Sequence, residues 1–427
     1  MQTITHIEDL RTIAKRKLPR AIFDFIDRGS YDEITMNSNT ADLRSLRLRQ
    51  RVMVDVSKRS LVTNIVGTSA AMPIALAPVG LSGLVYRNGE IAAARAAQAA
   101  GIPYCLSTMS ICSIEDVRAQ INTPFWFQLY VMKDRELTKS LIERAKRAEC
   151  SALVVTLDLQ VRAQQHLDIK NGLGVPPRLT LRNALNVATK PMWAMRILGG
   201  KRKSFGNLEG HVAGVENIKQ YATWIGSQLD PSLNWRDLDW LRSIWPNKLI
   251  VKGVLDAEDA RVAADGGADA IIVSNHGGRQ LDSASSSIAA LPSIVDSVGD
   301  RVEVMFDGGI RSGQDVIKAL ALGAKSCLIG RAFLYGLGAM GEAGVRIALE
   351  IIRKELDFSM ALTGVCDVSG ISRAVLIHQT DLVGGILPER RAFGPTFSPE
   401  LFAKKSEPMR GSNPPGNAQD MYESLRW

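Results

Sequence analysis

The stretch from Ser274 to Asp282, Ser-Asn-His-Gly-Gly-Arg-Gln-Leu-Asp, holds the residue types best suited to chemistry. It follows an apolar run, Ala270–Val273, that is typical of a buried strand. His276 can take up a proton near neutral pH, and Arg279 offers a planar fork that suits a carboxylate. The glycines between them let the backbone approach a flat ligand closely. A single histidine at a strand end is usually a packing residue. A functional role is favoured only if the other strand ends also carry residues suited to chemistry.

The composition is that of a compact α/β protein. Its 427 residues allow one large domain or two ordinary ones. Five cysteines without a CxxC pair predict free thiols in a reducing compartment. The N-terminus lacks the pattern of a signal peptide, and no run of about 18 apolar residues is present. These features predict a cytoplasmic protein without a membrane-spanning helix.

The net charge of +8 comes from one segment. Residues 169–208 include eight basic residues and no acidic one, so they account for the whole difference between the 52 basic and 44 acidic residues of the chain. A charge excess confined to one segment indicates a local partner surface, and we expect no nucleic-acid binding.

Strand-like apolar runs alternate with helix-like stretches over most of the chain. Eight such units in about 260 residues predict a (β/α)8 TIM barrel. A doubly wound open sheet is the alternative, but no GxGxxG motif follows the first strand. The predicted strands are 74–80, 103–108, 126–131, 152–158, 249–254, 270–275, 303–309 and 326–331, and the predicted helices between them include 89–100, 114–119, 134–148, 256–265, 286–298 and 313–322.

The remaining segments are expected to decorate this barrel. We predict one domain over residues 1–380, which begins with a helical cap at 1–30 and a short hairpin at 48–63. A basic insert, 176–230, separates the fourth and fifth strands. The C-terminal extension, 381–427, is rich in proline and glycine in part and is predicted to be partly disordered.

Polar residues or glycines stand at the end of every predicted strand, where the active sites of TIM barrels lie. Glycines and arginines after the last two strands suit a phosphate group, and Lys252 can place a cation beside a flat, electron-accepting ring. Asp307, at the strand end after that of His276, is the expected partner of the histidine. Together they predict a phosphorylated planar cofactor and no metal. The strand ends concerned carry Pro78, Val79, Gly80, Ser107, Thr108, Gln128, Tyr130, Thr156, Asp158, Lys252, Gly253, His276, Arg279, Asp307, Gly308, Gly309, Arg311, Gly330 and Arg331.

The stretch 274–282 is similar to the signature of the FMN-dependent 2-hydroxy acid dehydrogenases and oxidases. The resemblance covers about residues 4–378 and includes Lys-Leu-Pro at 17–19, Phe-Gln-Leu-Tyr-Val at 127–131, Asp-Ile-Lys-Asn at 168–171, Val-Lys-Gly at 251–253 and Lys-Ala-Leu-Ala-Leu-Gly-Ala at 318–324. It implies an FMN cofactor, a TIM barrel, often a homotetramer, and oxidation of an L-2-hydroxy acid, lactate- or mandelate-like, to the 2-oxo acid.

The resemblance also implies roles for single residues. His276 is the base with Asp307 as its partner, a hydride equivalent passes to flavin N5, Arg279 holds the substrate carboxylate, and Tyr130 contacts the substrate. Lys252 lies near the N1–O2 edge of the flavin and stabilises its reduced form. The implied FMN contacts are Pro78, Val79, Gly80, Ser107, Gln128, Thr156, Lys252, Ser274, Asp307, Gly308, Gly309, Arg311, Gly330 and Arg331.

Two residues of the expected substrate site depart from the family pattern. Phe25 stands where the family usually has a tyrosine, and Gln165 stands where it usually has an arginine. Loss of one charge-assisted hydrogen bond costs about 1.5–3 kcal/mol. The alternative to a lactate-like substrate is therefore a larger, atypical 2-hydroxy compound, for which Arg162 or His166 could reach into the site instead.

The basic insert mixes a tryptophan and other apolar residues with lysines and arginines at 177–208, a composition that suits an anionic membrane surface. In the resembling mandelate dehydrogenases this insert is a membrane anchor, which implies a peripheral position on the inner face of the cytoplasmic membrane and a quinone or another electron acceptor. Gly80, rather than alanine, fits a dehydrogenase better than an oxidase by the same resemblance. A mobile loop over the substrate site is the alternative.

Two other functions remain open on sequence grounds. A lyase or aldolase could use Lys252 as an amine nucleophile on a phosphorylated substrate, and such a protein would be colourless. A non-catalytic flavoprotein would explain the two altered substrate residues. The joint presence of His276, Asp307 and Arg279 argues against that second possibility.

Overall fold

The structure, a computed structural model, describes residues 3–173, 180–202, 204–210 and 218–377. Eight parallel strands form one sheet in the order β4-β11-β10-β9-β8-β7-β6-β5. An isolated parallel bridge between Leu76 and Tyr104 joins the two outer strands and closes the barrel. The predicted TIM barrel is confirmed, whereas the extension 381–427 lies outside the described residues. The strands are β4 (Ile74–Leu76), β5 (Cys105–Ser107), β6 (Trp126–Leu129), β7 (Ala152–Thr156), β8 (Lys248–Val254), β9 (Ala270–Val273), β10 (Glu303–Asp307) and β11 (Ser326–Ile329).

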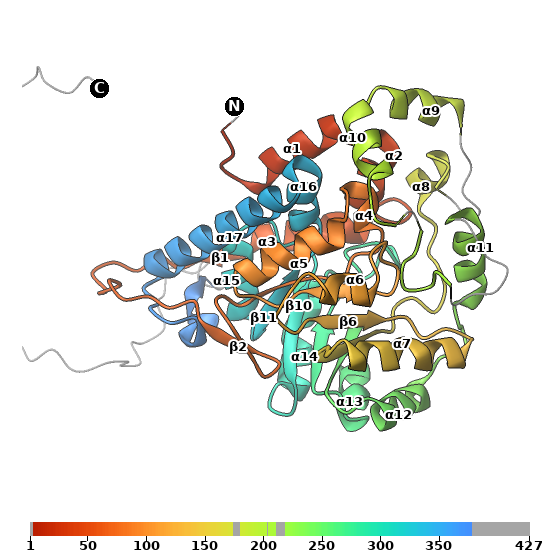
Figure 1. Cartoon of the computed structure of the whole chain (residues 1–427). Coiled ribbons are helices and arrows are strands. Elements are labelled where there is room, and N and C mark those ends of the chain that lie inside the picture. The colour runs from red at the N-terminus through yellow and green to blue at the C-terminus, as the bar shows by residue number, and fades with distance from the viewer. Residues whose placement is uncertain (1–2, 174–179, 203, 211–217, 378–427) are drawn as a thin grey trace, which may run out of the picture. The chain divides into compact units, whose positions relative to one another are not determined.

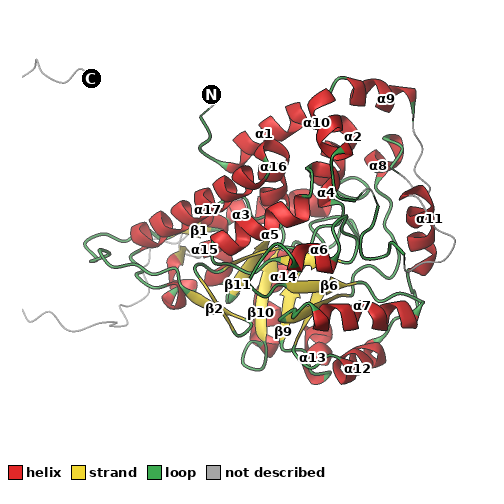
Figure 2. Ribbon diagram, in the orientation of Figure 1, coloured by secondary structure: helices red, strands yellow, loops and turns green. Residues whose placement is uncertain are grey.

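Helices surround the barrel, as Figures 1 and 2 show. Their starts follow from capping side chains: Asp134 accepts a hydrogen bond from the backbone N–H of Leu137, and Ser312 accepts one from that of Asp315. Their apolar faces pack on the strands, which read as continuous apolar runs because parallel strands are covered by helices outside and by the barrel core inside. The outer helices are α5 (Gly89–Ala99), α6 (Ile114–Arg118), α7 (Arg135–Arg147), α12 (Trp235–Ile244), α13 (Ala257–Asp265), α14 (Ser287–Val298), α15 (Gly313–Ala321), α16 (Arg331–Met340) and α17 (Glu342–Thr363).

The N-terminal region forms the helical cap that the sequence predicts. Its helices are α1 (Ile7–Lys17), α2 (Arg20–Asp27) and α3 (Ile34–Ser45), and a short helix, α4 (Ser82–Val85), lies near them. Leu10 and Ala14 are buried at helical spacing on α1, which packs against α16. Pro19 separates α1 from α2 because it cannot donate a backbone hydrogen bond.

The hairpin predicted at 48–63 is wrong in its position. The observed hairpin pairs β2 (Thr63–Ile65) with β3 (Thr68–Ala70), and its buried residues belong to the same apolar cluster as the barrel interior. The start of the predicted segment instead forms β1 (Arg47–Leu48), which pairs with β12 (Leu376–Ile377) near the other end of the domain. Weak alternation in the sequence could not reveal this pairing, because the partner strand is more than 300 residues away.

The insert between β7 and β8 carries helices α8 (His166–Lys170), α9 (Leu181–Ala188), α10 (Pro191–Leu198) and α11 (Ile218–Gln228). Helices α9 and α10 have no buried residue. Across the described residues, no helix combines the length and the apolar character needed to cross a bilayer.

The contact between α16 and α17 offers a stability test. A Cβ on Gly344 would lie 1.9 Å from the backbone oxygen of Gly336, so the two helices touch through backbone. Gly344→Ala should lower the free energy of unfolding by about 1–3 kcal/mol, because the helices must separate. The measurement is the midpoint of urea unfolding. Gly370→Ala is the control, since its Cβ would meet nothing closer than 3.9 Å; an equal effect of both changes would contradict the close packing.

Candidate active site

A cavity of about 460 Å³ opens at the carboxyl ends of the strands. All eight strands or the residues just after them contribute to its wall, so the strand ends that the sequence singled out do meet. Gln128 and Ser274 do not line the cavity and lie buried behind it. The predicted site residues on the wall are Phe25, Pro78, Val79, Gly80, Ser107, Tyr130, Thr156, Gln165, Lys252, His276, Arg279, Asp307, Gly308, Gly309, Arg311, Gly330 and Arg331.

The partner of His276 differs from the expected one. Nδ1 of His276 lies 2.9 Å from Oδ1 of Asp158, at the end of β7, and not beside Asp307. The prediction of an Asp307–His276 pair is therefore wrong. Burial by itself raises the pKa of the Asp158 carboxyl, but the attraction of His276 and Lys252 outweighs burial, and the pKa is lowered. Asp158 is thus a carboxylate that fixes one ring nitrogen of His276 and leaves Nε2 for a substrate.

Asp307 pairs with Lys252 instead. The Lys252 Nζ lies 3.1 Å from Oδ2 of Asp307 and donates to the Ser274 hydroxyl at 2.7 Å. Burial lowers the pKa of Lys252, but the nearby Asp307 and Asp158 carboxylates reverse this effect and raise it. A lysine held as an ammonium is a poor amine nucleophile, which argues against the lyase reading.

Several features of the wall and of the buried residues next to it fit a flavin nucleotide. Nε2 of Gln128 and Oδ1 of Asp307 are buried and have no hydrogen-bond partner. Such orphaned groups are costly unless a ligand satisfies them. Gly308 and Gly309 have φ values of 114° and 92°, so only glycine gives this backbone a low-energy course around a ligand. These residues can hold the polar edges and the ribityl chain of an FMN molecule.

The two arginines expected at the phosphate differ in their contacts. Arg311 donates to the carbonyl of Ile310, one residue before it. Arg331 donates to three backbone carbonyls, those of Ile26, Gly277 and Arg28. Burial lowers the pKa of Arg331 to about 10. Arg331 thereby ties the loop after β9 to the end of α2, in addition to lining the cavity.

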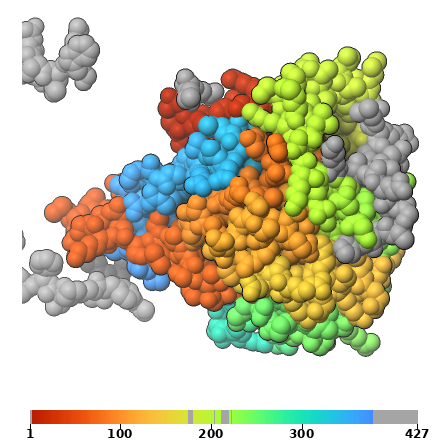
Figure 3. Space-filling model, in the orientation of Figure 1, coloured from red at the N-terminus to blue at the C-terminus, as the bar shows by residue number. Residues whose placement is uncertain are grey.

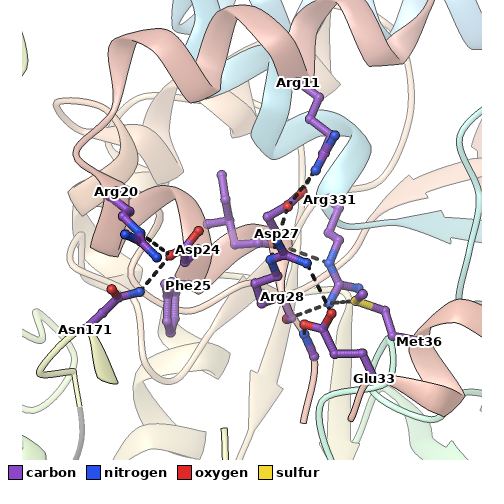
Figure 4. A network of polar contacts seen from close by, with 12 residues as sticks. Arg11, Arg20, Asp24, Phe25, Asp27, Arg28, Glu33, Met36, Asn171 and Arg331 are labelled. Atoms are coloured by element: carbon purple, nitrogen blue, oxygen red, sulfur yellow. Dashed lines mark hydrogen bonds and ion pairs between the residues drawn. The ribbon is translucent and has the colours of Figure 1, made fainter. Parts of the chain in front are cut away.

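Helix α2 sets the position of Phe25, as Figure 4 shows. Asp24 accepts hydrogen bonds from Asn171 at 2.8 Å and Arg20 at 3.4 Å, and Asp27 accepts a two-pronged contact from Arg11. These contacts hold the helix on both sides of Phe25. The ring of Phe25 therefore faces the cavity without the hydroxyl group that a tyrosine would bring.

Arg279 lies against this ring. Its guanidinium is 5.0 Å from the centroid of Phe25, and NH1 donates to the carbonyls of Phe25 and Arg28. NH2 donates to the side-chain oxygen of Gln165 at 3.3 Å. Burial lowers the pKa of Arg279, but a guanidinium group keeps its proton in proteins, so the side chain stays charged. With these backbone contacts, Arg279 is rigidly placed on the cavity wall.

Of the two residues expected to compensate for Gln165, Arg162 and His166, only one reaches the cavity. Arg162 lines the cavity, whereas His166 packs its ring against Tyr31 and does not line it. Arg162 also acts electrostatically on Arg279, which places the two cations near each other. Tyr130 lines the same cavity, and burial raises the pKa of its hydroxyl, so it is a neutral donor.

Comparison with known proteins adds to this geometry. The model of a family described as FMN-dependent dehydrogenase matches residues 14–378. An L-lactate dehydrogenase of Caulobacter vibrioides is 47% identical over 382 residues, which are 89% of this chain and 100% of that protein. An L-lactate dehydrogenase of Pseudomonas aeruginosa is 46% identical, over 87% of this chain and 97% of that protein.

Two solved structures are similar over nearly the whole described domain. The monotopic membrane protein (S)-mandelate dehydrogenase is 37% identical, with a TM-score of 0.84, over 88% of this chain and 100% of that chain. A mandelate oxidase is 36% identical, with a TM-score of 0.74, over 87% of this chain and 98% of that chain.

Proposed function

Because the chain belongs to the FMN-dependent dehydrogenase family and uses FMN, we propose that it oxidises an L-2-hydroxy acid to the 2-oxo acid. The observation that carries the proposal is that His276, paired with Asp158, lines the same cavity as Arg279. L-Lactate dehydrogenases at 46–47% identity and the mandelate enzymes support the substrate class.

His276 acts as the base. Its Nε2 takes the proton of the substrate hydroxyl while the carbon–hydrogen bond breaks and the carbonyl forms. FMN, when bound, accepts the hydride equivalent, that is, both electrons of the oxidation. Asp158 holds Nδ1 and stabilises the imidazolium that results, because it supplies a buried negative charge 2.9 Å away. Lys252 keeps its positive charge near the end of β8, on the side that would face the flavin ring.

The substrate carboxylate pairs with Arg279, and the Tyr130 hydroxyl donates a hydrogen bond to the reacting end of the molecule. Arg162, in the loop between β7 and α8, supplies a second positive charge on the cavity wall, in place of the arginine that Gln165 replaces. The remaining FMN contacts come from the strand ends. The cofactor would supply hydrogen-bond partners for Nε2 of Gln128 and Oδ1 of Asp307.

The substrate carries a larger apolar group than the methyl of lactate. Apolar side chains line much of the cavity that Phe25 faces, and the phenyl ring adds to that apolar surface without a hydroxyl group to solvate. The relatives at 46–47% identity are named for L-lactate, and mandelate, for which a similar solved structure is named, illustrates the larger class. The apolar residues are Leu81, Leu84, Phe205, Ile225 and Leu229.

The altered carboxylate site gives a direct prediction. Gln165→Arg should raise kcat/KM for small acids such as L-lactate by about 10-fold or more, because it adds one charge-assisted bond worth about 1.5–3 kcal/mol. Arg162→Met should raise KM for every carboxylate substrate by a similar factor. Steady-state kinetics with an artificial electron acceptor measures both. No gain from Gln165→Arg would contradict the view that the missing arginine at position 165 weakens the binding of small acids.

The proposal itself is tested by product analysis. The purified holoenzyme is incubated with a panel of L-2-hydroxy acids and a dye acceptor, and the 2-oxo acid is quantified against dye reduced. One 2-oxo acid per two electrons is the expected ratio. Dye reduction without a 2-oxo acid would contradict the proposed reaction.

We further propose a peripheral position at the inner face of the cytoplasmic membrane, with a quinone as the electron acceptor and a homotetramer as the assembly. The exposed helices α9 and α10 and the monotopic (S)-mandelate dehydrogenase support the membrane position. A membrane position brings the enzyme to lipid-soluble acceptors, and Gly80 at the cavity wall fits a dehydrogenase.

A further inference from the structure

A second cavity, of about 280 Å³, lies where α10 meets the end of α1 and the start of the segment after α4. Of the described residues, Val85 alone lines both this cavity and the active-site cavity. The second cavity therefore borders the active site but does not open from the strand ends. Its wall is cationic and apolar and includes no acidic residue. The residues are Arg16, Lys17, Leu18, Val85, Tyr86, Thr189, Lys190, Pro191, Met192, Trp193, Arg196, Ile197 and Gly338.

The four cations of this wall are not neutralised. Lys17 donates to the carbonyl of Ala339 at 2.6 Å, and Lys190 donates to the carbonyl of Arg16 at 2.5 Å. Arg196 lies 5.4 Å from the ring centroid of Tyr86. In the described part of the chain, none of the four forms an ion pair with a carboxylate. Several positive charges gathered in one concave site favour an anion and disfavour an uncharged ligand such as a quinone ring.

Exposed apolar residues lie on the two helices next to this cavity. Helices α9 and α10 expose large apolar side chains, each more than half accessible, and Figure 3 shows this segment in yellow-green at one end of the molecule. Trp193 is fixed in the cavity wall because its indole N–H donates to the carbonyl of Leu84 at 2.9 Å. Exposed apolar residues beside cations are the combination that binds an anionic lipid surface, where acyl chains adjoin the headgroup phosphates. The exposed residues are Leu181, Leu185, Met192, Met195 and Leu198.

We propose that this cavity binds the phosphate of an anionic phospholipid headgroup, with Arg16, Lys17, Lys190 and Arg196 as its cationic ligands. The proposal rests on the membrane position put forward above and adds the site and the chemistry of the lipid. Binding at this point would set the depth of α10 in the bilayer and hold the neighbouring active-site cavity at the membrane surface.

The test compares two variants from which the same charge is removed. Arg16→Gln/Arg196→Gln removes two cavity cations whose guanidinium groups make no described hydrogen bond. Lys170→Gln/Arg182→Gln removes two exposed cations of α8 and α9 on the same insert, outside the cavity. Each FMN-loaded protein is sedimented with phosphatidylcholine vesicles, with and without one quarter phosphatidylglycerol, in about 0.1 M salt. Flavin reduction by substrate confirms that each variant keeps its fold and active site.

We expect the unaltered protein to prefer the vesicles with phosphatidylglycerol. The cavity pair should lower the partition coefficient at least about 10-fold further than the control pair, since direct phosphate contacts exceed a diffuse surface charge. An equal loss of vesicle binding in both double variants would overturn the headgroup site in the cavity, but not the membrane position. No vesicle binding by the unaltered protein would overturn the headgroup site and the membrane position together. Flavin reduction would still test the proposed oxidation separately.

The source of the phosphate is separated by calorimetry without vesicles. Inorganic phosphate should not bind the holoenzyme below about 10 mM if the cavity serves a lipid, because the apolar contacts are then absent. Submillimolar binding of inorganic phosphate that is lost in Arg16→Gln/Arg196→Gln would assign the cavity to a soluble phosphate compound. That result would overturn the proposal that the cavity binds a lipid headgroup.

Discussion

His276→Gln should lower kcat by about 10³–10⁴-fold while FMN stays bound, because the variant has no base at the position of Nε2. The amide of glutamine can still fill most of the space of the ring and can still hydrogen-bond to Asp158. The measurement is the rate of flavin reduction in a stopped-flow instrument without oxygen, which isolates the chemical step from the later transfer of electrons to an acceptor.

Binding of substrate serves as the control for this variant. The Kd of a non-reacting 2-oxo acid should change by less than about 10-fold, since Arg279 and Tyr130 hold the carboxylate end. A variant that reduces its flavin at the original rate would show that another group, and not His276, takes the proton.

Asp158→Asn and Asp307→Asn should have different consequences, which follows from the pairs in the structure. Asp158→Asn removes the charge 2.9 Å from His276 and should lower kcat by about 10²–10³-fold with FMN affinity little changed. Asp307→Asn leaves His276 and Asp158 in place but weakens the partner of Lys252 and alters an orphaned oxygen of the cavity. It should lower FMN affinity and leave the rate per bound flavin within about 10-fold.

The two variants are compared by flavin reduction and by titration of the FMN-free protein with FMN. The pattern opposite to this one, with a slow Asp307→Asn and a fast Asp158→Asn, would support the pairing that the sequence predicted and contradict the one in the structure.

The strands and most helices could be predicted because each is a local pattern. The runs 152–155 and 270–273 are apolar over strand length, and Asp134 and Ser312 mark helix starts. The meeting of the strand ends could be predicted too, since a closed parallel barrel brings all its carboxyl ends to one face. The hairpin was misplaced because β1 pairs with a strand at the far end of the domain.

The pairing of charges could not be read from chain order. In a barrel, inward side chains of alternate strands share a layer, so contacts across the mouth skip one strand. His276 after β9 accordingly meets Asp158 after β7, and Lys252 of β8 meets Asp307 of β10. Reasoning from one strand end to the next predicted Asp307 for His276 and missed this alternation. His276 also has a φ of 57°, a local turn that no sequence pattern announces.

The most direct test of the proposed function is the visible spectrum of the holoenzyme while L-2-hydroxy acids are added one at a time without oxygen. We predict that the yellow flavin absorbance bleaches with at least one acid, that acids with larger apolar groups act faster than L-lactate, and that His276→Gln keeps its colour over the same time. A yellow protein that no 2-hydroxy acid bleaches would contradict the assignment of this cavity to 2-hydroxy acid oxidation.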